Sequence, residues 1–439
     1  EHKALAPGKE EYLNSEKFQY RPRDWAAASH TSLVPYLTML NQIRREHPAF
    51  HELRNLRFER IDNSQMIAWS KRHGDEVIVV ACVLDPHSPQ AGVLHLDLAA
   101  LAGQQAEAQS RLNVGVVLIG PVGDFGWSHM HDQGRRRMAE VLGDRVNATT
   151  VESVAPPDFD RVVTQLVRTG HRLIFTTSFS YFAPTQRLAP QHPGVFFENA
   201  TGPTTLPNMA IYNARFYEGR YIQGVIAARK SRSKTIGYVA TFPVPEVISA
   251  INTVMRGAWS VDPSMKVRVV WVNAWSNPAR EADAARALID QGCDVLCSHT
   301  DGPAPLQLAE QRGIFGFGQA SDMTRFAPRA HLTSSVNNWG DYYADRAKAV
   351  LDGTWRATDT WGGLGSGMFR MAPFTNMTPE EVSEATRIRD AIAAGTLHPF
   401  EGPITRQDGT VVIPAGRRLT DDEIRAQNYF YQGIDVAMP

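Results

Sequence analysis

The stretch from Asn113 to Ser128 decides how the rest of the chain is interpreted, and it reads N-V-G-V-V-L-I-G-P-V-G-D-F-G-W-S. Its first half, Val114 to Ile119, is a nearly continuous apolar run, which is typical of a strand buried on both faces of a parallel sheet. A glycine-rich loop follows, and a helical pattern then runs from His129 towards Leu142. The stretch therefore predicts a strand, a loop and a helix of an α/β fold.

The loop after this strand carries an acidic residue beside two large rings, Asp124, Phe125 and Trp127. In open α/β sheets, ligands bind beyond the carboxyl ends of the strands, so these side chains are candidates for a ligand clamp. The alternative is that the two rings only pack the loop against its own helix. Short motifs match by chance often, and the stretch by itself leaves both interpretations open.

Length and composition limit the possible classes of protein. The 439 residues are too many for one hydrophobic core, so we expect two or three domains. The formal net charge of -1 gives no reason to expect nucleic acid or an anionic membrane as a partner. No apolar run is long enough to span a bilayer. Besides Cys82, the chain has Cys293 and Cys297 on one predicted strand, where an extended backbone holds them too far apart to form a disulfide.

The first hundred residues have a pattern of their own. Apolar residues at helical spacing predict a helix over 31–46, and Pro48 ends it. The period then changes to two, which predicts strands near 66–71, 76–84 and 93–98. We expect a helix followed by a small antiparallel β module.

This segment contains the motifs E-E-Y-L-N-S-E-K-F at 10–18, R-P-R-D-W at 21–25, L-N-Q-I-R-R-E-H-P-A at 40–49 and L-D-P-H at 84–87. In these motifs it resembles the C-terminal end of the α-amylase-type maltosyltransferases that extend α-glucan from maltose 1-phosphate. In that family such a segment closes the barrel and adds a β-sandwich, while the catalytic carboxylates lie upstream. Because retaining glycosyl transfer needs two carboxylates on a rigid scaffold, we expect residues 1–104 to be catalytically inert.

The junction at 105–110 is rich in small residues, and Ala106-x-Ala108 has the form of a signal-peptidase cleavage site. The apolar residues before it are too few for the hydrophobic part of a signal peptide. Our hypothesis is that the junction is the tail of an export signal whose front half has been replaced by the maltosyltransferase-like segment.

From residue 111 onwards, strand-like and helical segments alternate, which predicts βαβ units and parallel sheets. The predicted strands are 114–119, 173–177, 195–197, 209–212, 236–240, 267–272, 294–298, 314–317 and 331–336. The predicted helices are 129–142, 159–169, 216–230, 244–258, 278–291, 303–312 and 338–352. Two such sets predict two lobes, at about 111–232 and 235–330, with later segments crossing back between them.

The predicted strand ends carry rings, carboxylates and amides that suit one shared cleft. They are Phe179 and Tyr181, Asn273 and Trp275, Asp301, Asp322, and Asn337 and Trp339. Facing rings suit a flat heterocycle, because stacking contributes roughly 1–3 kcal/mol per base. Carboxylates accept hydrogen bonds from ring N–H and amino groups and so fix the orientation of a ligand. For any single residue, a place in the core or at a helix cap explains it equally well.

Residues 111–439 contain a series of distinctive motifs: G-P-V-G-D-F-G-W at 120–127, H-D-Q-G-R at 131–135, F-T-T-S-F at 175–179, R-F-Y-E-G-R-Y at 215–221, I-G-Y-V-A at 236–240, F-P-V-P-E-V at 242–247, A-L-I-D-Q-G-C-D-V at 287–295, H-T-D at 299–301, A-V-L-D-G-T-W at 349–355 and H-P-F-E-G-P-I at 398–404. In these motifs the chain resembles the basic membrane protein (BMP) family of periplasmic substrate-binding proteins of ABC importers, which is related to bacterial purine nucleoside receptors.

The resemblance implies a type I periplasmic-binding-protein fold, in which two Rossmann-like lobes with three crossovers close on a purine. The family's aromatic residue at the end of the first strand corresponds to Phe125 or Trp127. Its acidic residue late in the second lobe corresponds to Asp301 or Asp322. Nucleoside receptors of the family tend to have a lysine where this chain has Asn337, which favours a free base such as adenine over a nucleoside. The implied partners are an ABC permease and its ATPase, and the implied location is the periplasm, with contact to the membrane only through the permease.

The sequence gives less support to other functions. His129 and His131 are two residues apart on a predicted helix and cannot share a metal, and no nucleophile or metalloprotease motif is present, so we expect neither enzyme activity nor a cofactor. A carbohydrate-active or glucan-binding protein, and a ligand sensor for a signalling partner, remain as alternatives.

Overall fold

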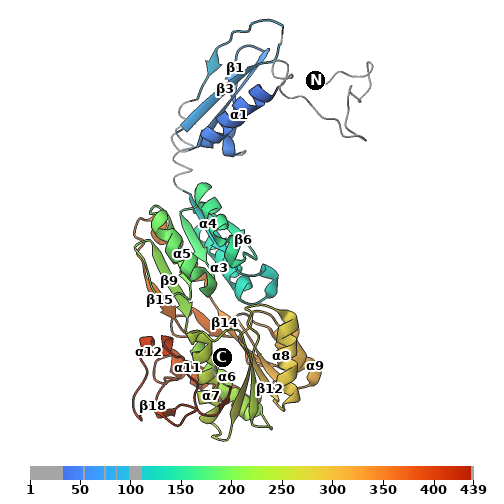
Figure 1. Ribbon diagram of the computed structural model, residues 1–439, viewed down its shortest axis with the longest axis vertical. Coiled ribbons are helices and arrows are strands. Elements are labelled where there is room, and N and C mark those ends of the chain that lie inside the picture. The colour runs from blue at the N-terminus through green and yellow to red at the C-terminus, as the bar shows by residue number, and fades with distance from the viewer. Residues whose placement is uncertain (1–32, 53–54, 74–75, 86, 98–110, 437–439) are drawn as a thin grey trace, which may run out of the picture. The chain divides into compact units, whose positions relative to one another are not determined.

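The computed structural model describes residues 33–52, 55–73, 76–85, 87–97 and 111–436, and the chain divides into two units at residue 111 (Figure 1). The motifs at 10–18 and 21–25 and the signal-like junction at 105–110 lie outside the described residues. None of the described helices is both long and apolar enough to cross a membrane.

The N-terminal unit is a helix with a small antiparallel sheet, as predicted. Helix α1 is Val34–Glu46, a 3-10 turn at Pro48–His51 follows, and the sheet has the order β3-β2-β1-β4. Its strands are β1 (Leu56–Ile61), β2 (Met66–His73), β3 (Glu76–Val83) and β4 (Leu94–His95). The prediction missed β1 because its polarity is inverted: Glu59 is buried and accepts a hydrogen bond from Ser70 Oγ at 2.5 Å, while Phe58 is exposed.

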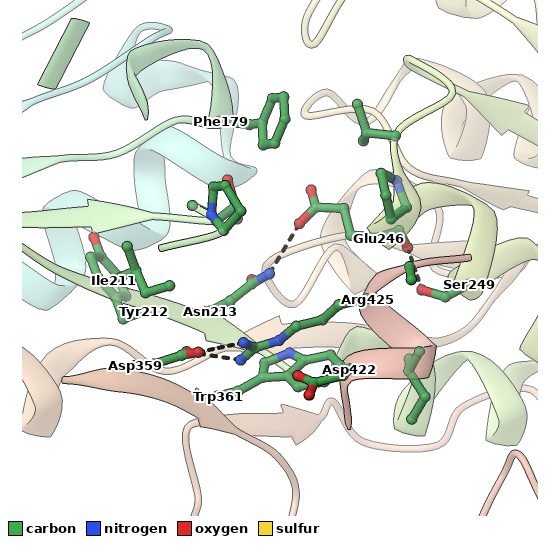
Figure 2. A pocket seen from close by; sticks show the side chains of 17 residues that line it. Phe179, Ile211, Tyr212, Asn213, Glu246, Ser249, Asp359, Trp361, Asp422 and Arg425 are labelled. Carbon is green, nitrogen blue, oxygen red and sulfur yellow. Dashed lines mark hydrogen bonds and ion pairs between the residues drawn. The ribbon is translucent and has the colours of Figure 1, made fainter. Parts of the chain in front are cut away.

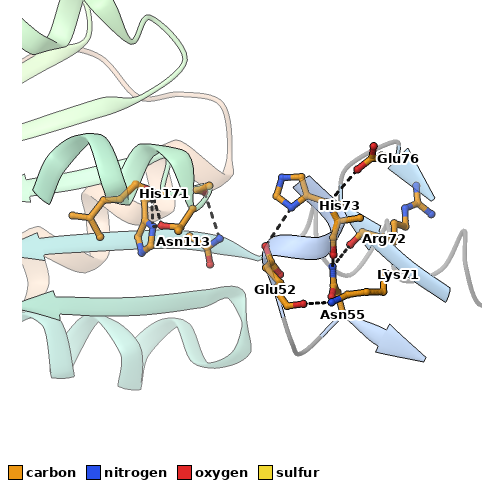
Figure 3. A network of polar contacts seen from close by, with 12 residues as sticks. Glu52, Asn55, Lys71, Arg72, His73, Glu76, Asn113 and His171 are labelled. Carbon is orange, nitrogen blue, oxygen red and sulfur yellow. Dashed lines mark hydrogen bonds and ion pairs between the residues drawn. The ribbon is translucent and has the colours of Figure 1, made fainter. Parts of the chain in front are cut away.

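Polar contacts tie the turn after α1 to this sheet (Figure 3). Asn55 Nδ2 donates to the carbonyl oxygens of Ala49 and Arg72, each at 2.8 Å, and Lys71 Nζ donates to the carbonyl oxygen of Glu52. The Glu76 carboxylate lies 2.7 Å from His47 Nδ1 and so ties the end of α1 to β3.

The first lobe of the second unit is a parallel sheet of order β15-β9-β8-β7-β5-β6. The strands are β5 (Leu112–Val117), β6 (Val146–Val151), β7 (Leu173–Thr176), β8 (Phe196–Ala200), β9 (Met209–Ala214) and β15 (Asp359–Gly362). Its helices are α3 (Trp127–Leu142), α4 (Phe159–Arg168), α5 (Phe182–Leu188) and α10 (Gly340–Leu351).

The second lobe is a sheet of order β16-β14-β13-β12-β10-β11-β19, in which only β16 is antiparallel to its neighbour. The strands are β10 (Thr235–Ala240), β11 (Lys266–Trp271), β12 (Val295–Ser298), β13 (Phe315–Gly318), β14 (His331–Asn337), β16 (Phe369–Met371) and β19 (Ile434–Asp435). The helices are α6 (Phe216–Lys230), α7 (Pro245–Trp259), α8 (Pro278–Asp290), α9 (Ala304–Arg312), α11 (Pro379–Ala393) and α12 (Asp421–Arg425), and a hairpin joins β17 (Ile404–Thr405) to β18 (Val411–Ile413).

The chain crosses between the lobes three times, from β9 through α6 to β10, from β14 through α10 to β15, and from β15 to β16. The predicted two-lobed α/β fold is thus confirmed. The prediction missed β6 and β15, because β6 is rich in polar and small residues and β15 has only four residues.

Two glycines let the second-lobe helices α6 and α7 pack closely. A Cβ at Gly224 would lie 2.1 Å from the carbonyl oxygen of Val254, and one at Gly257 would lie 2.0 Å from that of Tyr221. At the start of α6, the Glu218 carboxylate accepts the backbone N–H of Leu364 at 2.7 Å, which ties together two of the segments that cross between the lobes.

Candidate functional site

The carboxyl ends of the strands of both lobes meet around one narrow cavity. Its walls are Ile119, Trp127, Ser178, Phe179 and Thr201 from the first lobe, and Glu246, Trp275, His299, Asp301 and Gln319 from the second. Its volume is about 20 Å³, which is room for little more than one water molecule. A ligand can therefore enter only when the lobes separate.

The lobes touch directly around the cavity, so the structure is in a closed conformation. Trp275 Nε1 of the second lobe donates to Ser180 Oγ of the first at 3.2 Å. The Phe125 ring lies 5.3 Å from the Phe326 ring and 3.9 Å from the Arg325 guanidinium, while Ser321 Oγ donates to the Phe125 carbonyl oxygen. Phe125 is thus a closure contact.

Asp301 is the most unusual group in the cavity. It is 7% exposed, and among the described residues no donor contacts its carboxylate. Burial raises the pKa of Asp301 well above its ordinary value, and the nearby carboxylates of Asp124, Glu281 and Glu246 raise it further. Because a buried carboxylate without donors is costly, the position is destabilising unless a ligand supplies them.

Glu246 faces the same cavity from the first turn of α7. Asn213 Nδ2 donates to its Oε2 at 3.1 Å, yet burial raises the pKa of Glu246 to about 7. Glu218, which lies at the crossing segments, has its pKa raised to about 7 by the same cause.

These two glutamates predict that the unliganded protein becomes less stable as the pH rises. Between about pH 4.5 and 7, the folded chain keeps protons that the unfolded chain has released, so the free energy of unfolding falls as the pH increases through that window. We expect the melting temperature of the second unit to decline from pH 5 to pH 7.5. The decline should be smaller in Glu246→Gln but unchanged in Glu140→Gln, which alters an exposed residue of α3; equal slopes in all three proteins would contradict this.

His299 lies beside Asp301 and is a neutral group. Burial lowers the pKa of His299 well below its ordinary value, and the Arg220 charge adds to the effect. Its Nδ1 lies 3.3 Å from the Tyr238 hydroxyl, and its ring meets the edge of the Phe216 ring at 5.8 Å. The histidine therefore offers hydrogen bonds without a charge.

A second cavity of about 290 Å³ adjoins the narrow one and shares Phe179, Thr201 and Glu246 with it (Figure 2). Arg425 of α12 pairs with the Asp359 carboxylate of β15 on its far wall, with Nη2 2.8 Å from Oδ1. The Arg425 guanidinium also lies 4.5 Å from the ring of Trp361. The short helix α12 thus contacts the edge strand of the first lobe.

Four of the predicted site residues line the narrow cavity, namely Trp127, Phe179, Trp275 and Asp301. Phe179 lines both cavities and is 39% exposed, so its ring is available to a ligand. Trp127 is held in place by its Nε1, which donates to the Thr177 carbonyl oxygen at 2.6 Å.

Three predicted residues have structural roles instead. The Asp124 carboxylate accepts the backbone N–H groups of Gly126, Ser128 and His129 at 2.8, 3.2 and 3.1 Å, so it stabilises the start of α3. Tyr181 is fully buried in the first lobe, where its ring stacks on Phe159 and its hydroxyl donates to Val154. Trp339 is buried and stacks on His131 at 5.0 Å.

The remaining three also lie outside the cavity walls. Asn273 is exposed in a left-handed turn with φ 54°. Asp322 is exposed and accepts hydrogen bonds from the backbone N–H and hydroxyl of Thr324. Asn337 is fully buried at the end of β14, and neither atom of its side-chain amide has a partner among the described residues.

Six residues that line the cavity were not among the predicted site residues: Ile119, Ser178, Thr201, Glu246, His299 and Gln319. Ile119, Ser178, His299 and Gln319 lie at the end of a predicted strand or within two residues of it. The rule that ligands bind beyond strand ends therefore applies to them as it does to the residues that were predicted. Glu246 is separated from the end of β10 by a loop, and only the first-turn position on α7 points to it.

The two-lobed fold has a counterpart among solved structures. A solute-binding protein of an ABC transporter from Aeropyrum pernix has the same fold, with a TM-score of 0.57 over 65% of this chain and 92% of that one, at 20% identity. This likeness shows that the second unit has the two-lobed fold of that protein.

The chain belongs to the family of PnrA-like ABC transporter substrate-binding proteins, whose model matches residues 111–398. It is 50% identical over 341 residues to a purine-binding protein of Brucella abortus, covering 77% of this chain and 97% of that protein. It is also 37% identical over 283 residues to a putative ABC transporter glucose-binding protein of Haloferax volcanii, covering 64% of this chain and 71% of that one.

A second family model, that of the C-terminal part of GLGE, matches residues 58–118, most of which lie in the N-terminal unit. A maltose-1-phosphate maltosyltransferase of Streptomyces coelicolor is 53% identical over 100 residues, which are 22% of this chain. The matched part spans only 15% of that enzyme. Both predicted resemblances are thereby confirmed.

Proposed function

We propose that this chain binds a purine base, with adenine as the model ligand, between its two lobes and delivers it to an ABC permease and its ATPase. The observation that carries the proposal is the buried Asp301 carboxylate, which has no donor among the described residues and shares a cavity with three aromatic side chains. The purine-binding relative from Brucella abortus supports the choice of ligand class.

The side chains around the cavity suit a purine. The rings of Trp127, Phe179 and Trp275 offer flat surfaces, and stacking on aromatic side chains contributes roughly 1–3 kcal/mol per base. The Asp301 carboxylate accepts hydrogen bonds from ring N–H or amino groups. Asn337 supplies no charge for a ribose, which favours a free base over a nucleoside.

Location and the role of the N-terminal unit are part of the proposal. Delivery to an importer requires the second unit to act outside the cytoplasm, which we infer to be the periplasm. We assign no catalytic role to the N-terminal unit, because the segment that it resembles carries no catalytic carboxylates in its own family.

A thermal-shift panel with bases, nucleosides, glucose and maltosides tests this function in the full chain. A ligand at 100 times its dissociation constant stabilises a protein by about 2.7 kcal/mol, so adenine should raise the melting temperature of the second unit by several degrees. Phe179→Ala should reduce the shift, because it removes a partly exposed ring that lines the cavity. A shift with glucose or maltosides alone would contradict the proposal and favour a carbohydrate-binding protein.

A further inference from the structure

Arg220 of α6 is a fully buried arginine whose hydrogen-bond acceptors are neutral. Its Nη1 donates to Gln223 Oε1 at 2.8 Å, and its Nη2 donates to Gln319 Oε1. Within the described part of the chain, no carboxylate forms an ion pair with this guanidinium, whose central carbon lies 5.7 Å from the Tyr238 ring. The two glutamine side chains are therefore its direct polar contacts.

This contact fixes which way the Gln319 amide is turned. A guanidinium has donors only, so the amide must direct its oxygen to Arg220 and its NH₂ group elsewhere. Gln223 follows the same rule, since its oxygen accepts from Arg220 while its Nε2 donates to Ser335 Oγ at 3.1 Å. Gln319 Nε2, in contrast, has no acceptor among the described residues, and Gln319 lines the narrow cavity.

We propose that Gln319 determines ligand specificity as a fixed N–H donor, and that Arg220 is the positioning residue that fixes it. The inference rests on the proposed function and deepens it. Asp301, in the same cavity, is the acceptor, so the preferred ligand is a flat heterocycle that offers an in-plane lone pair to Gln319 and an N–H group to Asp301. A ligand that lacks this lone pair leaves the Gln319 donor without a partner.

Ring-edited ligands test the role of Gln319. We expect Gln319→Leu in the full chain to weaken adenine binding by about 10–100-fold, measured by calorimetry, because the buried lone pair of adenine is left without a donor. One of 1-, 3- or 7-deazaadenine, which each lack one ring nitrogen, should bind the unmodified protein more weakly than adenine by a similar factor. That analogue and adenine should bind Gln319→Leu with about equal affinity. If Gln319→Leu instead lowers the affinity for adenine and for all three analogues by the same factor, the proposal is overturned.

Arg220→Met tests the positioning role through selectivity rather than affinity. Without the guanidinium, the Gln319 amide is free to turn, so the preference for adenine over the sensitive analogue should fall to within about threefold. Arg220→Lys, which keeps a donor-only group, should restore part of that preference. If Arg220→Met does not fold, Gln319→Glu replaces it in the experiment. The new carboxylate pairs with Arg220 and has no N–H to donate, so the preference for adenine over the sensitive analogue should again be lost. Full selectivity in the folded variants would overturn the positioning role.

These outcomes separate the two proposals. Failure of adenine and every other purine to bind the unmodified chain removes the proposed function. Tight adenine binding that is indifferent to substitutions at Gln319 and Arg220 removes only the specificity role.

Discussion

Replacing Asp301 with asparagine is expected to weaken adenine binding by about 10–100-fold and to raise the melting temperature of the unliganded protein. The first effect follows because a hydrogen bond to a charged group contributes roughly 1.5–3 kcal/mol. The second follows because burial and the carboxylates of Asp124, Glu281 and Glu246 all disfavour an ionised Asp301, so a neutral amide of the same shape removes that penalty. Loss of function combined with gain of stability is the signature of a binding residue.

Asp322→Asn is the matched control for this experiment. Asp322 is the other acidic residue that the family resemblance offered, but it is exposed and accepts hydrogen bonds only within its own turn. We expect its replacement to leave adenine affinity within about twofold. Calorimetry and thermal denaturation measure both quantities, and equal affinity losses in the two variants would contradict the assignment of Asp301.

A single methyl group at Gly126 is expected to abolish tight binding by preventing closure. In the closed structure, a Cβ at Gly126 would lie 1.7 Å from the carbonyl oxygen of Asp301 in the opposite lobe. No side-chain movement relieves a clash with a backbone atom, so Gly126→Ala must keep the lobes apart. The apparent affinity falls with the population of the closed state, and we expect a loss of about 100-fold or more.

Gly123→Ala serves as the control, because no atom lies within 4 Å of a Cβ at that position of the same loop. Small-angle scattering should show ligand-dependent compaction of the unmodified chain and of Gly123→Ala, but not of Gly126→Ala. An unchanged circular dichroism spectrum establishes that Gly126→Ala is folded. Normal affinity in a folded Gly126→Ala would contradict the closure mechanism.

The sequence predicted the fold well because strand and helix periodicities differ clearly in the second unit. The apolar run before Gly120 and the later buried strands are unambiguous, and their alternation with helices requires parallel sheets. Strand β1 was not predicted, because its one buried side chain, Glu59, is polar while Phe58 is exposed. Such an inversion depends on tertiary partners that no local pattern contains.

The site was predictable only to the level of the strand ends. Trp127 and Trp275 line the cavity, whereas Tyr181 and Trp339, which also follow strands, are buried in the first lobe. A shift of one or two residues in a loop reverses the direction of a side chain, and the sequence does not fix that shift. Asp124 shows the same limit, since a carboxylate before a helix serves equally as a helix cap or as a ligand contact.

Calorimetric titration of the full chain with adenine tests the central claim most directly. We expect one binding site per chain, with affinity that falls in Asp301→Asn and persists in Asp322→Asn. Absence of binding by adenine and every other purine, together with saturable binding of glucose or a maltoside, would contradict it.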